Sequence, residues 1–181
     1  MRVVEKAQLM SATEIDRTLQ RLAHEILERT SELDRLVLVG IRRRGVPLAE
    51  RLARNMRSIL GRPISVGSLD ITLYRDDLST IAPQPVVQAS DVPIVDDRDI
   101  LLVDDVLYTG RTTRAAMNGL FDLGRPRRVR LCTLIDRGHR ELPVEASFIG
   151  RTVQTRPSEF IEVRLEEIDH EERVVVVDRV G

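Results

Sequence analysis

Two adjacent acidic residues and a cluster of small polar residues follow one apolar stretch of the chain. Asp104 and Asp105 come directly after the apolar residues 100–103, and Thr109 and Gly110 follow shortly afterwards. A carboxylate can accept hydrogen bonds from the neighbouring hydroxyl groups of a sugar. Small residues that lead into a helix leave backbone N–H groups free to bind an anion. This combination of groups suits a phosphorylated ribose.

Each half of this pattern also has an ordinary explanation. An acidic pair can lie in a solvated loop or bind magnesium, and the sequence Thr-Gly-Arg-Thr can simply cap a helix. The order of the parts favours the ribose-phosphate interpretation. We expect the strand to end at Asp104, so that both carboxylates lie at the carboxyl edge of a sheet, where open α/β folds bind ligands. Magnesium need not compete, because a pyrophosphate ligand would carry it.

Three consecutive arginines form a second candidate site. Arg42, Arg43 and Arg44 lie between Gly40 and Gly45, directly after another short apolar run. Guanidinium groups match the geometry of phosphate oxygens, although three arginines in a turn are often only solvated. Their position at the end of an expected strand favours the phosphate-binding interpretation.

Helices and strands alternate along the chain, which is typical of a parallel α/β sheet. A capping box made by Ser11 and Glu14 marks the clearest helix start. Helices are expected over residues 11–29, 47–60 and 112–123, and strands over 36–40, 64–73, 86–94, 100–103, 129–135, 148–149, 162–165 and 174–177. The second helix has four apolar residues on its expected inner face: Leu48, Leu52, Met56 and Ile59. Polar loops are expected over residues 74–85 and 136–143.

The composition indicates a folded protein without a membrane segment. Hydrophobic residues make up 42% of the 181 residues, enough for a packed core, and no apolar run approaches the length of a membrane helix. The first ten residues do not resemble a signal peptide. Cys132 is the only cysteine, so we expect a cytoplasmic protein. A net charge of −1 gives no general attraction to nucleic acid, so an RNA site would be a local patch.

Three segments resemble known proteins: residues 70–78, 103–112 and 136–142. The second resembles the phosphoribosyl motif of the type I phosphoribosyltransferases. The first and third are more specific and resemble the PyrR family. Members of that family are bifunctional: they are uracil phosphoribosyltransferases that also regulate pyrimidine operons by transcription attenuation. The resemblance spans nearly the whole chain.

The resemblance implies one phosphoribosyltransferase domain over residues 1–181. Its α/β fold would have a central parallel sheet flanked by helices, with a small hood formed by the N-terminal and C-terminal segments. The reaction would convert uracil and 5-phosphoribosyl 1-pyrophosphate (PRPP) to UMP and pyrophosphate, with Mg²⁺ carried by PRPP. The family forms dimers and higher assemblies, and a two-fold homodimer is the simplest expectation.

The resemblance also implies three catalytic residues. Asp104 and Asp105 would hold the ribose hydroxyls near the positive charge that develops on the ring. Arg75 would reach the pyrophosphate from a loop that closes over the substrate. Arginines and Mg²⁺ would balance the charge of the leaving group. No residue is a strong candidate for a general base, and Asp136 is the one that could serve.

The implied substrate-binding residues fall into three groups. The pyrophosphate loop would comprise Gly40, Ile41, Arg42, Arg43 and Arg44. The 5′-phosphate would be bound by Val106, Leu107, Tyr108, Thr109, Gly110, Arg111 and Thr112. Two residues would lie where the hood meets the base: Asp136 and Arg137. The arginine at position 43 departs from the family, in which a small hydroxyl residue is common there.

Basic residues on the first expected helix form a candidate RNA surface. Charge alone indicates no more than a solvated helix face. The resemblance implies that leader mRNA of the pyrimidine operon binds a set of basic residues, and that UMP favours this binding. The set comprises Arg17, Arg21, His24, Arg29, His139 and Arg140. Glu145 departs from the family, in which a basic residue can occur there.

Three alternatives remain open from the sequence. The enzyme could act on another base, such as a purine or orotate. The chain could be a nucleotide-sensing RNA-binding regulator with little catalysis, although the intact acidic pair and arginine loop argue weakly against this. A generic α/β domain for another phosphorylated ligand is left only if the resemblance misleads.

Overall fold

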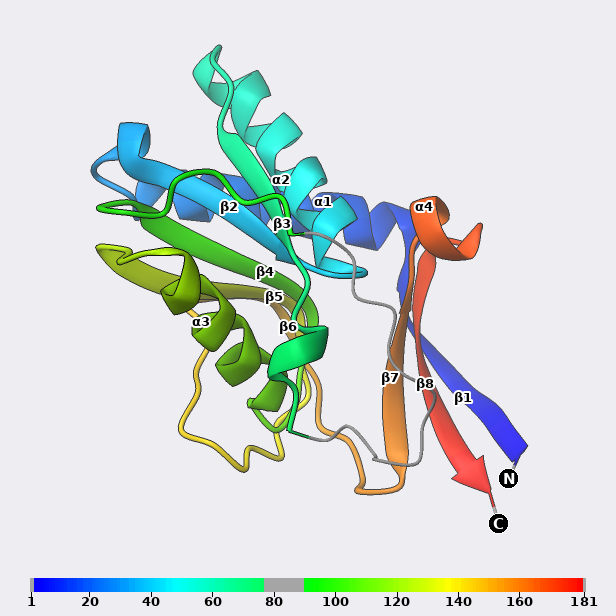
Figure 1. The fold of residues 1–181 in the computed structure, drawn as a ribbon. Coiled ribbons are helices and arrows are strands. Elements are labelled where there is room, and N and C mark those ends of the chain that lie inside the picture. Colours follow the sequence, from blue (N-terminus) through cyan, green and yellow to red (C-terminus); the bar gives the residue numbers. More distant parts are fainter. Residues whose placement is uncertain (1, 77–89, 181) are drawn as a thin grey trace.

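Strand β2 (Leu36–Ile41) is buried along its whole length and lies inside the fold. Its alternate side chains point to opposite faces of the sheet, so that Leu38 packs in one buried apolar cluster and Val39 in another. Both faces of the sheet must therefore be covered. In this computed structural model, which describes residues 2–76 and 90–180, helices cover both of them (Figure 1).

Within the described residues, five parallel strands form the main sheet in the order β3-β2-β4-β5-β6. The strands beside β2 are β3 (Ser65–Leu69), β4 (Asp99–Leu107), β5 (Arg128–Asp136) and β6 (Phe148–Thr152). One face is covered by α1 (Ala12–Glu28) and α2 (Gly45–Leu60), and the other by α3 (Arg111–Leu123). The expected fold class, a central parallel sheet flanked by helices, is confirmed.

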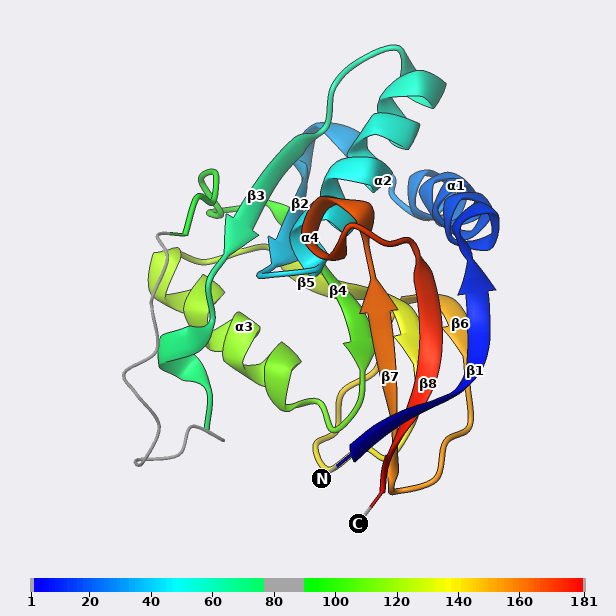
Figure 2. The same ribbon diagram turned by 90° about the vertical axis from the view of Figure 1, so that its right-hand side faces the viewer.

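A second, antiparallel sheet combines the two ends of the described chain in the order β1-β8-β7. Its elements are β1 (Arg2–Ser11), β7 (Glu159–Arg164), the short helix α4 (Glu166–Asp169) and β8 (Arg173–Val180). Figure 2 shows this small sheet beside the end of β4. Strand β1 was not expected, because its side chains are exposed on both faces almost to Met10. Backbone pairing with β8 holds it in place.

Ion pairs fix the small sheet to the main body. Arg51 of α2 donates to Glu167 of α4 (Nη2–Oε2, 2.6 Å) and to Glu172 before β8 (Nη2–Oε2, 2.9 Å). Arg44, just before the same helix, pairs with Asp169 (Nη2–Oδ1, 2.6 Å). The Arg51 side chain is only 18% exposed, so solvent screens its pairs less than ordinary surface pairs.

Replacing Arg51 by methionine should lower the free energy of unfolding by about 2 kcal/mol, because two acidic partners then lack a cation. Arg57→Met is the matched control: Arg57 is exposed on the same helix, and its loss should cost less than about 0.5 kcal/mol. Chemical denaturation of both variants measures the difference. Equal unfolding free energies would contradict an anchoring role for Arg51.

Two helix ends that the sequence marked clearly are confirmed. The Ser11 hydroxyl accepts from the Glu14 amide (3.3 Å), and the Glu14 carboxylate accepts from the Ser11 amide (2.7 Å), which completes the capping box. Gly61 ends α2 with a left-handed φ of 72°. In the part of the chain that the structure describes, every helix is too short or too polar to cross a membrane.

Helix α2 differs from expectation at its start and in the exposure of one residue near its end. It begins at Gly45 instead of Pro47. Pro47 lies in the first turn, where its missing N–H group has no helical partner to lose. Ile59, expected on the inner face, is 44% exposed, because the last turns of α2 extend beyond the sheet (Figure 1).

The segment after β3 is less regular than expected. The strand predicted over residues 64–73 ends at Leu69 and is followed by a 3-10 turn, η2 (Thr72–Tyr74). Of the strand predicted over residues 86–94, positions 86–89 lie outside the described residues. The remainder forms only an isolated bridge between Ser68 and Asp91, since aspartate and proline at positions 91 and 93 disfavour a longer ladder.

Candidate active site

Strand β4 carries the acidic pair to the carboxyl end of the main sheet. Its pairing with β2 stops at Val103, whereas its pairing with β5 continues to Leu107. The prediction that the strand ends at Asp104 is therefore wrong, because β5 supplies backbone partners beyond that point. Asp104 and Asp105 lie in the part of β4 that has no β2 neighbour, which leaves space beside the strand.

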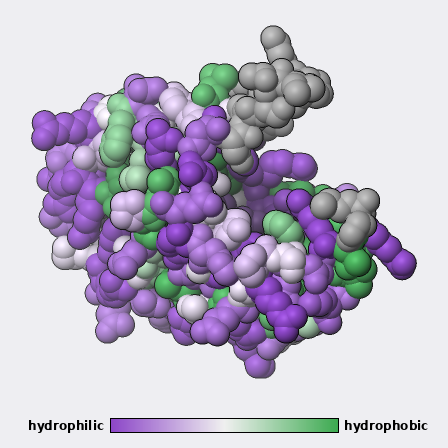
Figure 3. All heavy atoms as spheres, turned by 90° about the horizontal axis from the view of Figure 1, so that it is seen from below, coloured by the Kyte–Doolittle hydropathy of each residue, from purple (hydrophilic) through white to green (hydrophobic). Residues whose placement is uncertain are grey.

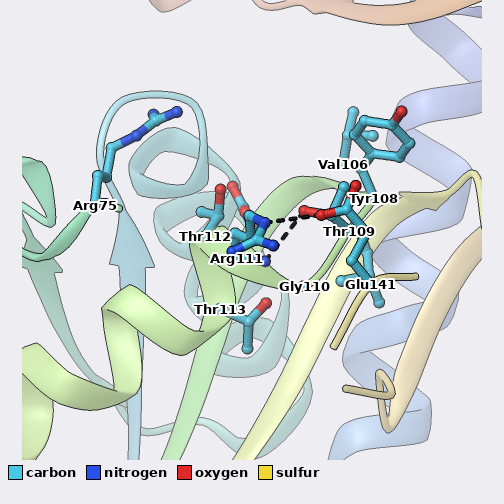
Figure 4. Close-up of a pocket in the computed structure, with 11 residues that line it drawn as sticks. Arg75, Val106, Tyr108, Thr109, Gly110, Arg111, Thr112, Thr113 and Glu141 are labelled. Carbon is cyan, nitrogen blue, oxygen red and sulfur yellow. Dashed lines mark hydrogen bonds and ion pairs between the residues drawn. The ribbon is translucent and has the colours of Figure 1, made fainter. Parts of the chain in front are cut away.

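A cavity of about 300 Å³ lies beside the tip of β4 (Figure 4). Gly110 precedes α3 with a φ of 93°, which other residues rarely adopt, so the chain turns sharply into the helix. The amides and positive dipole end of α3 therefore face the cavity. Figure 3 looks at the molecule from below and shows a mostly hydrophilic surface with a hollow in it. The cavity is lined by Arg75, Asp104, Val106, Leu107, Tyr108, Thr109, Gly110, Arg111, Thr112, Thr113 and Glu141.

The two acidic side chains face different cavities, because successive side chains of a strand point to opposite sides. Asp104 lines the first cavity and is 9% exposed, whereas Asp105 lines a second cavity of about 320 Å³ together with Arg44 and Asp169. Burial, and then the charge of Asp105, raise the pKa of Asp104 well above its ordinary value, and the charge of Arg75 partly offsets this. The acids thus line two cavities, but their carboxyl groups meet at the strand tip, where a hydrogen bond between them also raises the pKa of Asp104.

The arginine loop, residues 40–45, is held against the tip of β4 because its two glycines lie very close to neighbouring backbone atoms. A side-chain carbon at Gly45 would lie 2.2 Å from the Val103 carbonyl oxygen, and one at Gly40 would lie 2.6 Å from the Gly45 carbonyl oxygen. Only glycine allows the start of α2 to approach β4 so closely. Ile41 is 1% exposed, so its side chain belongs to the core and only its backbone can meet a ligand.

The three arginines of this loop have different surroundings. Arg42 donates to the Ser68 hydroxyl at the end of β3 (Nη2–Oγ, 3.0 Å). Arg43 is exposed, and its peptide bond with Arg42 is cis. Arg44 is paired with Asp169, and the hydrogen bond that it donates to this carboxylate raises the pKa of Arg44. From the sequence, the three arginines had the same expected role, but the structure places their side chains in three different environments.

The end of β5 joins the main sheet to the small sheet. Arg137 is 3% exposed, lies 4.0 Å from the Tyr108 ring centroid and donates to the Glu159 carbonyl (Nη2–O, 2.6 Å). Burial lowers the pKa of this arginine. Burial also opposes ionisation of Asp136, but hydrogen bonds from Arg140 and a backbone amide outweigh it and lower the pKa of Asp136. Asp136 is therefore a weak base.

One residue that lines the first cavity, Glu141, was not among the predicted site residues. Glu141 pairs with Arg111 (Oε2–Nε, 2.8 Å), as Figure 4 shows, and Arg111 also pairs with Asp76 (Nη1–Oδ2, 2.7 Å). Thr113 is buried in the first turn of α3. The only signal for Glu141 was its place in the family-like segment 136–142. Thr113 continues the hydroxyl run of the phosphoribosyl motif.

The candidate RNA residues on α1 and at its C-cap are exposed: Arg17, Arg21, His24 and Arg29. Two of them reach the edge strand β6 or the residue before it. Arg21 donates to the Gly150 carbonyl (Nη2–O, 2.6 Å), and Arg29 donates to the Ser147 carbonyl (Nη1–O, 2.8 Å). His24 leans the other way and lines a groove with residues of α2. The basic face of α1 thus follows the edge of the main sheet.

The two remaining candidate RNA residues lie in the loop after β5 and differ from each other. His139 is exposed, and its Nε2 is 2.7 Å from the Thr155 carbonyl oxygen, just beyond β6. Arg140 is turned inward and pairs with Asp136 (Nη2–Oδ2, 2.7 Å). The structure therefore brings His139, but not the charged group of Arg140, to the surface near the end of β6.

Fold and site together define a phosphoribosyltransferase. Residues 7–167 match the family described as "Phosphoribosyl transferase domain". A solved structure of a hypoxanthine phosphoribosyltransferase from Staphylococcus aureus has the same fold, with a TM-score of 0.72 and 18% identity over 96% of this chain and 92% of that one.

Two curated relatives are much more similar, and both are named "Bifunctional protein PyrR". The protein of Pelotomaculum thermopropionicum is 58% identical over 96% of this chain and 97% of its own length. The protein of Thermus thermophilus is 52% identical over 97% of this chain and 98% of its own length. The chain belongs to the PyrR family, as the sequence motifs indicated.

Proposed function

We propose that this protein transfers the phosphoribosyl group of PRPP to uracil, giving UMP and pyrophosphate, and that it also regulates pyrimidine operons. One observation carries the enzymatic part. A carboxylate at the tip of β4, Asp104, shares a cavity with the N-terminus of α3, and the chain is of the PyrR family. That cavity offers an acceptor for ribose hydroxyls beside donors for the 5′-phosphate.

Roles follow from these positions. Asp104 and Asp105 hold the ribose and balance the positive charge that develops when pyrophosphate leaves. Arg75 meets the pyrophosphate from the side of the cavity. The 5′-phosphate lies on the backbone of residues 106–112. Arg42 and the exposed Arg43 bind the pyrophosphate. Arg44 chiefly holds the small sheet in place through its ion pair with Asp169.

The small sheet acts as the hood over the base. Its strand β7 borders the cavity that Asp105 lines. Arg137 joins β7 to Tyr108 in residues 106–112, which we call the phosphate loop. Asp136 and Arg137 then lie where main sheet and hood meet. Because hydrogen bonds lower the pKa of Asp136, we assign it to positioning and not to proton transfer.

The donor set fits magnesium that arrives with the substrate. Among residues 2–76 and 90–180, no group of three or more His, Cys, Asp or Glu side chains could hold a metal by itself. Magnesium commonly takes one or two carboxylates and completes its shell with substrate phosphates and water. Asp104 and Asp105 could supply those carboxylates, and the ion would neutralise charge on the pyrophosphate.

The choice of base is tested by PRPP-dependent release of pyrophosphate. Purified protein with Mg²⁺ and PRPP should release pyrophosphate with uracil, and much less with hypoxanthine, guanine or orotate. Turnover with a purine or orotate instead would assign another base. No turnover with any base, together with UMP binding, would indicate a nucleotide sensor.

The regulatory part of the proposal is UMP-dependent binding of pyrimidine-operon leader mRNA. Arg21 and Arg29 contact residues 147–150 along the edge strand β6, and His139 contacts Thr155, just beyond the other end of that strand. Such a line can track a phosphate backbone. We place this activity, and the protein, in the cytoplasm, and we propose a homodimer or a higher homo-oligomer.

RNA affinity should fall steeply with salt, because binding releases counterions from the neutralised phosphates. If the arginines of α1 each contact a phosphate, log Kd plotted against log salt should have a slope of at least about 2, and Arg17→Gln should reduce it by about 0.7–0.9. Fluorescence titration of a leader stem-loop across a salt series measures this. A flat salt response would exclude this surface.

A further inference from the structure

Arg140 is turned into the protein and not toward solvent. Its Nη2 donates to Asp136 (2.7 Å), its Nη1 to the Tyr108 carbonyl (2.9 Å) and its Nε to the Val144 carbonyl (2.8 Å). The side chain is 24% exposed, and the Asp136 carboxylate balances its charge. Each guanidinium nitrogen already has an acceptor inside the protein, which leaves little of the group for an external phosphate.

The residues after Arg140 bind the phosphate loop as well. The amides of Glu141 and Leu142 both donate to the Thr109 carbonyl, at 2.9 and 3.0 Å. The Glu141 carboxylate accepts from Arg111 at the start of α3 (2.8 Å). The loop after β5 therefore holds the backbone of the phosphate loop from outside at several points.

The two loops also share an aromatic contact that reaches the surface. The Tyr108 ring has the Arg137 guanidinium 4.0 Å from its centroid, and it meets the His139 ring edge to face, with centroids 6.0 Å apart. His139 is exposed and belongs to the proposed RNA surface. Tyr108 thus has the phosphate site on one side and an exposed histidine on the other.

We infer that Arg140 is a positioning residue that joins the phosphate loop to the loop after β5, so that a phosphate bound before α3 sets the position of His139. This inference rests on the proposed function and gives its regulatory part a physical path. A bound phosphate orders the amides of the phosphate loop, and the loop hydrogen-bonded to it is ordered too. The protein loop then loses less conformational entropy when RNA binds. By reciprocity, bound RNA increases the affinity for UMP.

Arg140→Gln in the full chain tests the inference. Three measurements are compared with wild type: the KM for PRPP, the affinity for UMP, and RNA affinity with and without saturating UMP across a salt series. We expect the KM for PRPP to rise, and UMP affinity to fall, on the order of tenfold, because the phosphate loop loses its support. RNA affinity without UMP and its salt slope should stay unchanged, and UMP should no longer tighten RNA binding.

A control variant shows whether the loss of an arginine charge elsewhere on the protein has the same effect. Arg62→Gln removes an arginine from an exposed pair with Asp34 and should equal wild type in UMP synthesis. A salt slope that falls in Arg140→Gln, with the UMP effect retained, would overturn the inference, because Arg140 would then contact RNA directly. An unchanged KM for PRPP together with an unchanged UMP effect would overturn it as well.

Arg140→Lys provides the same test if the glutamine variant does not fold. Lysine keeps the charge but lacks the planar fork that reaches three acceptors, so the UMP effect should still be lost. A wild-type UMP effect in this variant would contradict the inference. The wild-type protein tests the proposed function separately: if it makes no UMP from uracil or binds no RNA, the proposed function fails before any variant is compared.

Discussion

The variant Asp104→Asn/Asp105→Asn should retain its fold and lose UMP synthesis, with kcat/KM at least about 10³-fold below wild type. Asparagine keeps the shape of the side chains but removes the charge that opposes the positive charge developing on the ribose. Pyrophosphate-release kinetics of the double variant and both single variants measure the loss. Asp34→Asn, at an exposed position, is the matched control and should leave the rate unchanged.

Stability provides a second measurement on the same variants, because the fold opposes ionisation of Asp104. Burial and the charge of Asp105 raise the pKa of Asp104 above the ordinary value of 3.8. The folded protein therefore holds this proton more tightly than the unfolded chain does. Stability contributed by the protonated form is present below the unfolded pKa and is lost as pH rises through the folded pKa.

Asp104→Asn should remove that loss, so its Tm near neutral pH should equal or exceed that of wild type. Thermal unfolding at about pH 5 and about pH 8 checks the sign, since the advantage of the variant should be larger at the higher pH. A Tm well below wild type would mean that lost activity reflects unfolding, and the catalytic interpretation of Asp104 would lose its support.

Gly45→Ala should reduce kcat/KM on the order of 100-fold or more, because displacements of about 1 Å at a reacting centre have effects of this size. The new carbon would lie 2.2 Å from the Val103 carbonyl oxygen. Val103 directly precedes Asp104, so either the arginine loop or the acidic strand must move. Steady-state kinetics at saturating PRPP would show the loss in kcat, which added substrate cannot restore.

Gly61→Ala is the matched control, at the other end of the same helix. Gly61 has a φ of 72° and no atom within 4 Å of the added carbon. The substitution should cost about 1 kcal/mol of stability through backbone strain and leave the kinetics unchanged. If both variants lose stability equally and neither loses activity, the close approach of α2 to β4 does not position the site.

The sequence predicted the core elements well, because their side chains face one packed environment. The 3.6-residue period of α1, its capping box and the buried run before Asp104 each indicated the observed element. Strand β1 was missed because most of its side chains are exposed, and only pairing with distant β8 makes it a strand. Strand β4 was predicted too short, because its last part depends on β5 and not on its own apolar residues.

The site was predictable as a set of residues but not as a geometry. The phosphoribosyl motif indicated Asp104 and the loop up to Thr112, and these line one cavity. The sequence could not show that Asp105 faces a second cavity, since that depends on strand alternation continuing past Asp104. It also gave Arg140 an outward role, whereas the carbonyls that bind its guanidinium come from residues that the fold brings together.

A crystal structure with bound UMP measures the central claim most directly. The 5′-phosphate should lie on the amides at the start of α3, and the ribose hydroxyls should lie within hydrogen-bond distance of Asp104 or Asp105. The uracil ring should then point toward Arg137 and the small sheet. UMP found in another cavity, with the start of α3 empty, would contradict the account.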